Sequence, residues 1–414
     1  MTQYTTLRRA APQISLMAVM IFLSMYSRMV MSPLLVFIQE ALAVGPAAAT
    51  RLFLPQSVAY SGAMVLSGFL AGSVGHRRTI AASGAVLGIG LIVVAVGNSL
   101  AVMHLGFGMI GAGAGLYPPS GVASLTGMVH PDIRGKAIAI HEVGPNSAFV
   151  IAPLIVAAGV YLGNWRWVPG LSGVAAIVMA VTFDRTSVAG GVKAERPQLD
   201  NLKQLFTKPE FWAITVFFSV AASSTVGVFS ILPTFLIGTE GYPVGVANSV
   251  ISISRISGIG MLFVSGILVD RIGVRRLIGG VLAITGVLTV GIGALTGNAM
   301  LAAVALQPII IAAFFPAAVS AIADIGPPEM RGIAVSFMIP MVNIIASGVF
   351  PTLMGFLTER DLVRAGFVGL GVVMLTTLIL LPMLPDHRPA PVAPTPPDPA
   401  RSRAPHQRST SSPS

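Results

Sequence analysis

Long apolar stretches separated by short polar loops run through almost the whole chain. Twelve of these stretches have about the length that a helix needs to cross a bilayer. We expect them at 14–38, 52–75, 79–97, 101–126, 136–160, 167–183, 211–237, 247–269, 277–296, 300–323, 333–358 and 363–384. The pattern predicts an all-α integral membrane protein with twelve transmembrane helices.

The composition excludes most soluble classes of protein. Of the 414 residues, 54% are hydrophobic and only 10% are charged, whereas soluble proteins carry about 25% charged residues. The net charge is +10, but the basic residues are scattered through short loops, so we expect no nucleic-acid partner. The absence of cysteine excludes a thiol nucleophile and a cysteine-ligated metal site.

Loop charges predict the orientation of the chain. If both termini lie in the cytoplasm, the inner segments hold 19 Lys or Arg residues and the outer segments hold four. This bias follows the positive-inside rule. We therefore expect a multi-pass protein of the cell inner membrane with both termini cytoplasmic.

The polar segments divide the chain into five parts. We expect a cytoplasmic N-terminus at 1–13, a six-helix bundle at 14–183, a cytoplasmic linker at 184–210, a second six-helix bundle at 211–384 and a disordered cytoplasmic tail at 385–414. The tail is rich in Pro, Ser and Arg and has too few apolar residues to form a core.

The two predicted bundles repeat each other at an offset of 197 or 198 residues. The matched pairs are the loops 68–78 and 266–276, the loops 131–135 and 328–332, Asn146 with Asn343, and Pro153 with Pro351. Such a constant offset indicates an internal duplication.

The second-half loop carries the pattern G-x-x-x-D-R-x-G-x-R-R at Gly266, Asp270, Arg271, Gly273, Arg275 and Arg276. In this pattern the chain resembles the major facilitator superfamily of secondary transporters over about 14–384. The resemblance implies two pseudo-symmetric six-helix bundles around a central cavity, a substrate site near the midplane, and alternating access by rocking of the bundles. It also implies that the protein works as a monomer.

The same resemblance implies that the loop residues gate the transporter. On this basis we expect gating roles for Asp270, Arg271, Arg275, Arg134 and Arg331. The first-half loop departs from the pattern, because Gly72 and Ser73 stand in place of the Asp and Arg. The latch that the Asp forms is therefore expected to be weaker in the first half.

Three charged residues fall deep inside predicted spans, where charges are costly and usually functional. Two of them are Arg28 and Arg255, each with serines at helical spacing, and a guanidinium offers bidentate hydrogen bonds to an anion. We predict a substrate site that contains Arg28, Arg255, Ser24, Ser252 and Asn343. The alternative is that both arginines form structural ion pairs inside the bundles.

The third buried charge is Glu142, which follows His141 in the fifth span. A desolvated carboxylate and a neighbouring imidazole can both exchange a proton near neutral pH, so we predict that Glu142 and His141 carry the coupling proton. Alternatively, Glu142 neutralises Arg28 or Arg255 in a gating salt bridge. With six His and no cluster of carboxylates, we expect neither a metal nor a cofactor.

Two arginines and one carboxylate leave the predicted site with a net positive charge. We therefore expect a proton-coupled symporter for a small (organic) anion. Several organic-anion branches of the superfamily similarly place arginines in one or both halves. The alternative within transport is proton-driven efflux of amphipathic or drug-like compounds. An alternative of another class is a transporter-like sensor or a non-transporting membrane protein. We expect no enzyme, because no catalytic groups converge.

Overall fold

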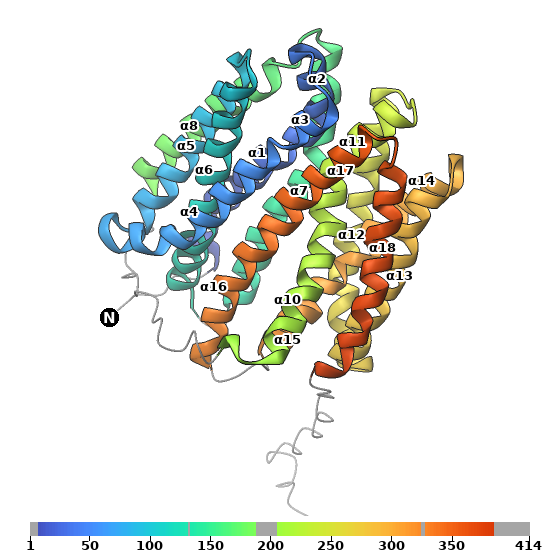
Figure 1. Ribbon diagram of the computed structural model, residues 1–414. Helices are drawn as coiled ribbons and strands as arrows, with labels where there is room; N and C mark the ends of the chain where they lie inside the picture. Colours follow the sequence, from blue (N-terminus) through green and yellow to red (C-terminus); the bar gives the residue numbers. More distant parts are fainter. Residues whose placement is uncertain (1–6, 131–132, 188–204, 324–327, 385–414) are drawn as a thin grey trace, which may run out of the picture.

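The structure is a computed structural model that describes residues 7–130, 133–187, 205–323 and 328–384. Most of the predicted linker and the whole predicted tail lie outside the described residues. Figure 1 shows long helices that run roughly alongside one another in two groups.

The first group of helices comprises α1 (Leu7–Met29), α2 (Met31–Leu42), α3 (Pro46–Thr50), α4 (Phe53–Val74), α5 (His76–Val96), α6 (Leu100–Met128), α7 (Arg134–Tyr161) and α8 (Trp167–Thr186). The second comprises α10 (Pro209–Ala222), η2 (Ser223–Gly227), α11 (Val228–Thr234), η3 (Phe235–Thr239), α12 (Val244–Ile272), α13 (Val274–Ala294), α14 (Gly297–Ala312), α15 (Phe314–Ala323), α16 (Pro328–Ile344), η4 (Ile345–Val349), α17 (Phe350–Thr358), α18 (Val363–Thr377) and η5 (Leu378–Met383). The predicted all-α fold is confirmed.

Eleven helical stretches within the described ranges are long and apolar enough to cross a membrane. The predicted eighth span corresponds to α12, whose 29 residues extend over about 44 Å at 1.5 Å per residue. The helix α1 is already formed at Leu7, seven residues before the predicted span. The difference arises because hydropathy marks where a helix meets lipid, whereas backbone hydrogen bonding decides where the helix begins.

The internal repeat extends to the loops at the helix ends. The Arg166 guanidinium donates to the carbonyl oxygens of Ala95 and Gly97, both at 2.8 Å. Exactly 198 residues later in the chain, Arg364 donates to the carbonyl oxygens of Gly293 and Leu295, at 3.3 and 2.7 Å. Each arginine thus satisfies carbonyl groups at the end of a helix that has no further turn to bond them.

The signature loops also share one backbone conformation. Gly75, between α4 and α5, has φ +85°, and Gly273, between α12 and α13, has φ +84°. Side chains with a Cβ are disfavoured in this region. The glycine therefore allows each pair of helices to be joined through a single residue.

We expect Gly273→Ala to lower the free energy of unfolding by about 1–2 kcal/mol, because alanine must adopt the positive φ. The measurement is thermal unfolding of the purified protein in detergent. Gly280→Ala is the matched control, since a Cβ at this position in α13 meets no atom within 4 Å. If the two variants unfold at the same temperature, the conformational explanation is wrong.

The two halves meet where α2 packs against α11 and along two seams on either side of this contact. In the first seam, α3 and α4 pack against α16, η4 and α17; in the second, α7 packs against α12. Figure 1 shows α16 and α17 in orange beside the blue helices of the first half. We call the end of the bundle where α3 meets α17 the α3–α17 end. The residues of both seams come from helices that the repeat relates, so each seam is an approximate copy of the other.

Candidate functional site

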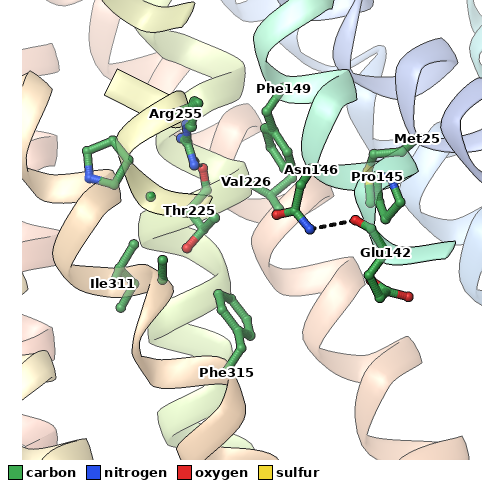
Figure 2. Close-up of a pocket in the computed structure, with 13 residues that line it drawn as sticks. Met25, Glu142, Pro145, Asn146, Phe149, Thr225, Val226, Arg255, Ile311 and Phe315 are labelled. Carbon is green, nitrogen blue, oxygen red and sulfur yellow. Dashed lines mark hydrogen bonds between the residues drawn. The ribbon is translucent and has the colours of Figure 1, made fainter. Parts of the chain in front are cut away.

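A cavity of about 260 Å³ opens at the second seam and receives side chains from both halves. Its polar lining residues are Glu142 and Asn146 of α7, Thr225 of η2 and Arg255 of α12, and the rest of its lining is apolar. Figure 2 shows Arg255 on one side of this cavity and Glu142 on the other. The structure thus brings two of the three predicted buried charges to one cavity.

Arg255 is held by a backbone carbonyl and two aromatic rings. Its Nη2 donates to the carbonyl oxygen of Thr225 at 2.9 Å. Its Cζ lies 5.0 Å from the ring centroid of Phe149 and 5.2 Å from that of Phe229, within the range of cation–π attraction. Because the two ring centroids are only 5.1 Å apart, both rings lie on the same side of the guanidinium.

This arrangement leaves part of the guanidinium unused. The Nε of Arg255 is buried and has no hydrogen-bond partner among the described residues. An unpaired buried donor is costly, and more so when it is charged. Arg255 as a whole is only half-buried and lines the cavity, so its guanidinium is placed to bind an anionic ligand through charge-assisted hydrogen bonds.

Arg28 lies in a different environment, at the first seam. It is only 6% exposed, and its Nη2 donates to Asn343 Oδ1 at 2.6 Å and to Ser347 Oγ at 3.2 Å. Its Cζ lies 4.0 Å from the centroid of the Tyr60 ring. Arg28 does not line the cavity at Arg255, so the structure places the two predicted arginines at separate seams.

Both arginines bind at π-helical turns. Thr225, which accepts from Arg255, belongs to η2, and Ser347, which accepts from Arg28, belongs to η4. Such turns occur frequently at functional sites in helices. Neither arginine forms an ion pair with an acidic residue of the described chain, so neutral groups and rings surround both charges.

The predicted serines bond to backbone carbonyls of neighbouring helices. Ser24 Oγ donates to the carbonyl oxygen of Ala114 at 3.1 Å, and Ser252 Oγ donates to that of Val150 at 3.0 Å. The second bond crosses the α7–α12 seam. Asn343 binds Arg28 and donates to the carbonyl oxygen of Ser57 at 3.2 Å. Substrate binding by Ser24, Ser252 and Asn343 stays a prediction, and none of the three lines the cavity.

A chain of hydrogen bonds leads from the cavity into the first bundle. Glu142, whose side chain is 53% exposed, lies with Oε1 3.2 Å from Nδ1 of the buried His141. Nε2 of His141 lies 3.0 Å from the hydroxyl oxygen of Tyr117. That hydroxyl donates to the carbonyl oxygen of Met17 at 2.8 Å. The chain thus joins one cavity residue to two buried polar side chains.

The His141–Glu142 pair has two protonation states that keep its hydrogen bond. With a proton on Nδ1, a neutral imidazole donates to the free carboxylate. With one proton more, the pair is an imidazolium beside a carboxylate or an imidazole beside a carboxylic acid. Both states fit the 3.2 Å between Nδ1 of His141 and Oε1 of Glu142.

The predicted gating residues lie at the loops as expected from the sequence. Arg134 Nε donates to the carbonyl oxygen of Thr126 at 3.0 Å. Arg271 is exposed in the last turn of α12, and Arg275 is half-buried in the first turn of α13. Asp270 and Arg331 lie within α12 and α16, but their side chains are outside the described set. Their gating roles stay predictions.

The α3–α17 end is closed by contacts that the sequence analysis did not find. The Ala47 backbone N–H donates to Glu359 Oε1 at 2.9 Å, and Ser61 Oγ donates to the carbonyl oxygen of Pro340 at 2.9 Å. Together with the bond from Arg28 to Asn343, they form a polar line along the first seam. These partners lie about 280 to 315 residues apart in the sequence, so no local sequence pattern predicts the contacts.

We expect Asn343→Ala to open the α3–α17 end, because Arg28 and Ser57 then lose their partner across the seam. Ala49 is fully buried at this end, and the chain has no native cysteine. In an Ala49→Cys background, Asn343→Ala should raise the rate of maleimide labelling several-fold. Tyr161→Cys, at a position that is 91% exposed, is the control whose labelling rate should not change. Equal labelling of Ala49→Cys with and without Asn343→Ala contradicts the expectation that Asn343 keeps the α3–α17 end closed.

Three residues of the site were not identified from the sequence. Phe149 and Phe229 contact the guanidinium of Arg255 through their rings, but nothing in the sequence distinguishes them from other phenylalanines in apolar spans. Asn146 was recognised only as the repeat partner of Asn343. Its position four residues after Glu142 places both on one helical face, and this spacing was the available signal.

Comparisons with known proteins identify the family of the fold. The model of the Major Facilitator Superfamily matches residues 17–306 and 256–411. No curated protein sequence matches the chain significantly.

Several solved transporters share the fold. A bacterial homologue of the human lysosomal transporter Spinster, in an inward-facing and occupied conformation, is 17% identical with a TM-score of 0.71, covering 92% of this chain and 96% of that one. A peptide transporter in complex with sulfate is 15% identical with a TM-score of 0.74, over 89% and 93%. A nucleoside transporter is 14% identical with a TM-score of 0.75, over 89% and 98%. At these identities the likeness concerns the fold alone.

Proposed function

The chain belongs to the Major Facilitator Superfamily of secondary transporters, and from this membership and the cavity at Arg255 we propose that it carries a small organic anion together with protons. The proposal includes alternating access between the two bundles, insertion in the cell inner membrane with both termini cytoplasmic, and function as a monomer. The protein is a transporter and not an enzyme.

The observation that carries the proposal is the guanidinium of Arg255 on the wall of the cavity, where it forms no ion pair with an acidic residue of the described chain. A cation of this kind favours an anion over a cationic or neutral solute. The cavity also has apolar walls, including Phe315, Ile311 and Pro308, which exclude water and pack against the carbon skeleton of an organic ligand. Its volume of about 260 Å³ lies just below the roughly 300–1,000 Å³ of ordinary ligand pockets, so the expected anion is small.

Proton coupling is proposed for the pair His141–Glu142. Glu142 lines the same cavity as Arg255, and the pair can take up one extra proton without losing its hydrogen bond. Loss of this proton leaves a free negative charge on the cavity wall, which disfavours a bound anion. Substrate binding and protonation therefore support each other, as a symporter requires.

The experiment is uptake by proteoliposomes that contain the wild-type protein. A panel of inorganic anions, small carboxylates, amphipathic cations and neutral drugs is tested with an imposed pH gradient while proton movement is followed with a pH-sensitive dye. We expect carboxylate-dependent proton movement in the same direction as uptake. Activity with cations or drugs alone, or anion movement without protons, contradicts the proposal.

A further inference from the structure

The internal repeat relates the surroundings of the two arginines. An offset of 197 or 198 residues maps Arg28 onto Val226, Ser57 onto Arg255, and Asn343 onto Asn146. Arg28, Ser57 and Asn343 lie at the first seam. Val226, Arg255 and Asn146 line the cavity at the second seam. Each seam therefore contains one arginine and one asparagine, although the arginines stand on non-equivalent helices.

In the first seam the arginine and the asparagine bind each other. Arg28 Nη2 donates to Asn343 Oδ1 at 2.6 Å, and Asn343 Nδ2 donates to the carbonyl oxygen of Ser57 at 3.2 Å. Protein atoms thus bind Nη2 of the guanidinium and the carboxamide, whereas Nε of Arg28, like that of Arg255, is buried without a partner among the described residues. Because the two side chains bind each other directly, no ligand lies between these two groups.

In the second seam the corresponding pair faces a cavity. Arg255 and Asn146 both line it, and Nε of Arg255 is without a partner. Asn146 Nδ2 donates to the carbonyl oxygen of Glu142 at 2.8 Å, which fixes the carboxamide. Figure 2 shows its oxygen turned away from Glu142, toward the side of the cavity where Arg255 lies. Asn146 therefore offers an acceptor, and Arg255 offers donors, to the same space.

We propose that Asn146 selects hydroxycarboxylates, with the carboxylate of the substrate on Arg255 and its hydroxyl donating to Asn146 Oδ1. This assignment rests on the proposed function and names its substrate class. A hydroxyl is preferred to an ammonium as the donor, because the cationic Arg255 repels a second positive charge in the cavity. Asn146 acts here as a specificity-determining residue, and Arg255 supplies the anchor.

The test compares matched carboxylates that differ by one hydroxyl. Uptake of lactate and propionate, and of 3-hydroxybutyrate and butyrate, is measured in proteoliposomes with the full-length protein. For at least one pair, the wild type should carry the hydroxy compound with a kcat/KM about tenfold higher, the effect of one good hydrogen bond in a buried site. Alanine, which carries an ammonium in place of the hydroxyl of lactate, should be carried poorly.

Two variants then separate specificity from structure. Asn146→Ala should lower the preference to within about twofold, mainly by slowing uptake of the hydroxy compound. Asn343→Ala, at the repeat-related position, should change the uptake of both members of a pair alike. A damaged helix α7 would also lower both members alike, so the ratio is the decisive readout.

The outcomes are distinguishable. If the wild type carries the carboxylates without preferring a hydroxyl, or if Asn146→Ala retains the wild-type preference, the inference about Asn146 is wrong and the proposed function stands. If the wild type carries alanine better than lactate, the donor is an ammonium and the assignment to hydroxycarboxylates is overturned. If no carboxylate is carried, the proposed function itself fails.

Discussion

Arg255→Ala is expected to lower kcat/KM for the transported anion by at least about 30-fold. The guanidinium is the cation of the cavity, and it is already anchored by Thr225 and two phenylalanine rings. Removing one partner of a buried charge-assisted contact costs about 2–5 kcal/mol, and each 1.4 kcal/mol corresponds to a factor of ten. The measurement is initial uptake of the best anion from the panel at several concentrations.

Arg255→Lys is the informative companion variant. Lysine keeps the positive charge but loses the planar fork that binds a carboxylate with two hydrogen bonds. We expect an intermediate loss, with a larger effect on KM than on the maximal rate. Arg166→Lys is a matched control, because Arg166 binds helix-end carbonyls away from the cavity. Undiminished uptake by correctly folded Arg255→Ala excludes Arg255 as the anion anchor.

Glu142→Gln is expected to abolish accumulation driven by a pH gradient. If one proton accompanies each singly charged anion, a difference of one pH unit across the membrane supports about tenfold accumulation of the anion. This is because one pH unit corresponds to about 1.4 kcal/mol. Glutamine keeps the size of the side chain but cannot take up a proton at this position beside His141. The ratio of substrate concentrations inside and outside the vesicles should therefore fall from about ten to one, whereas exchange of substrate across the membrane should continue.

The control for this experiment is Glu40→Gln, which changes an exposed glutamate in α2 and should retain accumulation. His141→Gln is expected to reproduce the uncoupling only in part, because Glu142 remains on the cavity wall. Full accumulation by Glu142→Gln would assign the coupling proton to another group. Loss of both accumulation and exchange would instead indicate that Glu142 is needed for binding itself.

The sequence predicted the fold because its signals are long and repeated. Twenty apolar residues in a row exclude water-soluble structures, and in a bilayer the backbone must satisfy its own hydrogen bonds, which favours helices. The offset of 198 residues between the halves survives in the structure down to Arg166 and Arg364 and to the positive φ angles of Gly75 and Gly273. Helix ends were less predictable, as Leu7 shows, because apolarity and helicity end at different residues.

Only the charged residues of the candidate site could be predicted from the sequence. The cost of placing Arg28, Arg255 and Glu142 within membrane spans made them candidates for a functional role. Which of them meet was not predictable. Arg28 binds Asn343 from 315 residues away, and the repeat gave no indication, because Val226 stands at the position related to Arg28.

The sequence by itself determined that the chain spans a membrane as two related helical halves and which charges lie within the spans, because both follow from the transfer of residues between water and lipid. The tertiary structure decided that Arg28 closes the first seam whereas Arg255 faces a cavity with Glu142 and Asn146. This division arises from packing at the two seams, where side chains from opposite halves either fill the space between helices or leave a cavity. The same repeated positions therefore form a closed contact in one half and a candidate substrate site in the other.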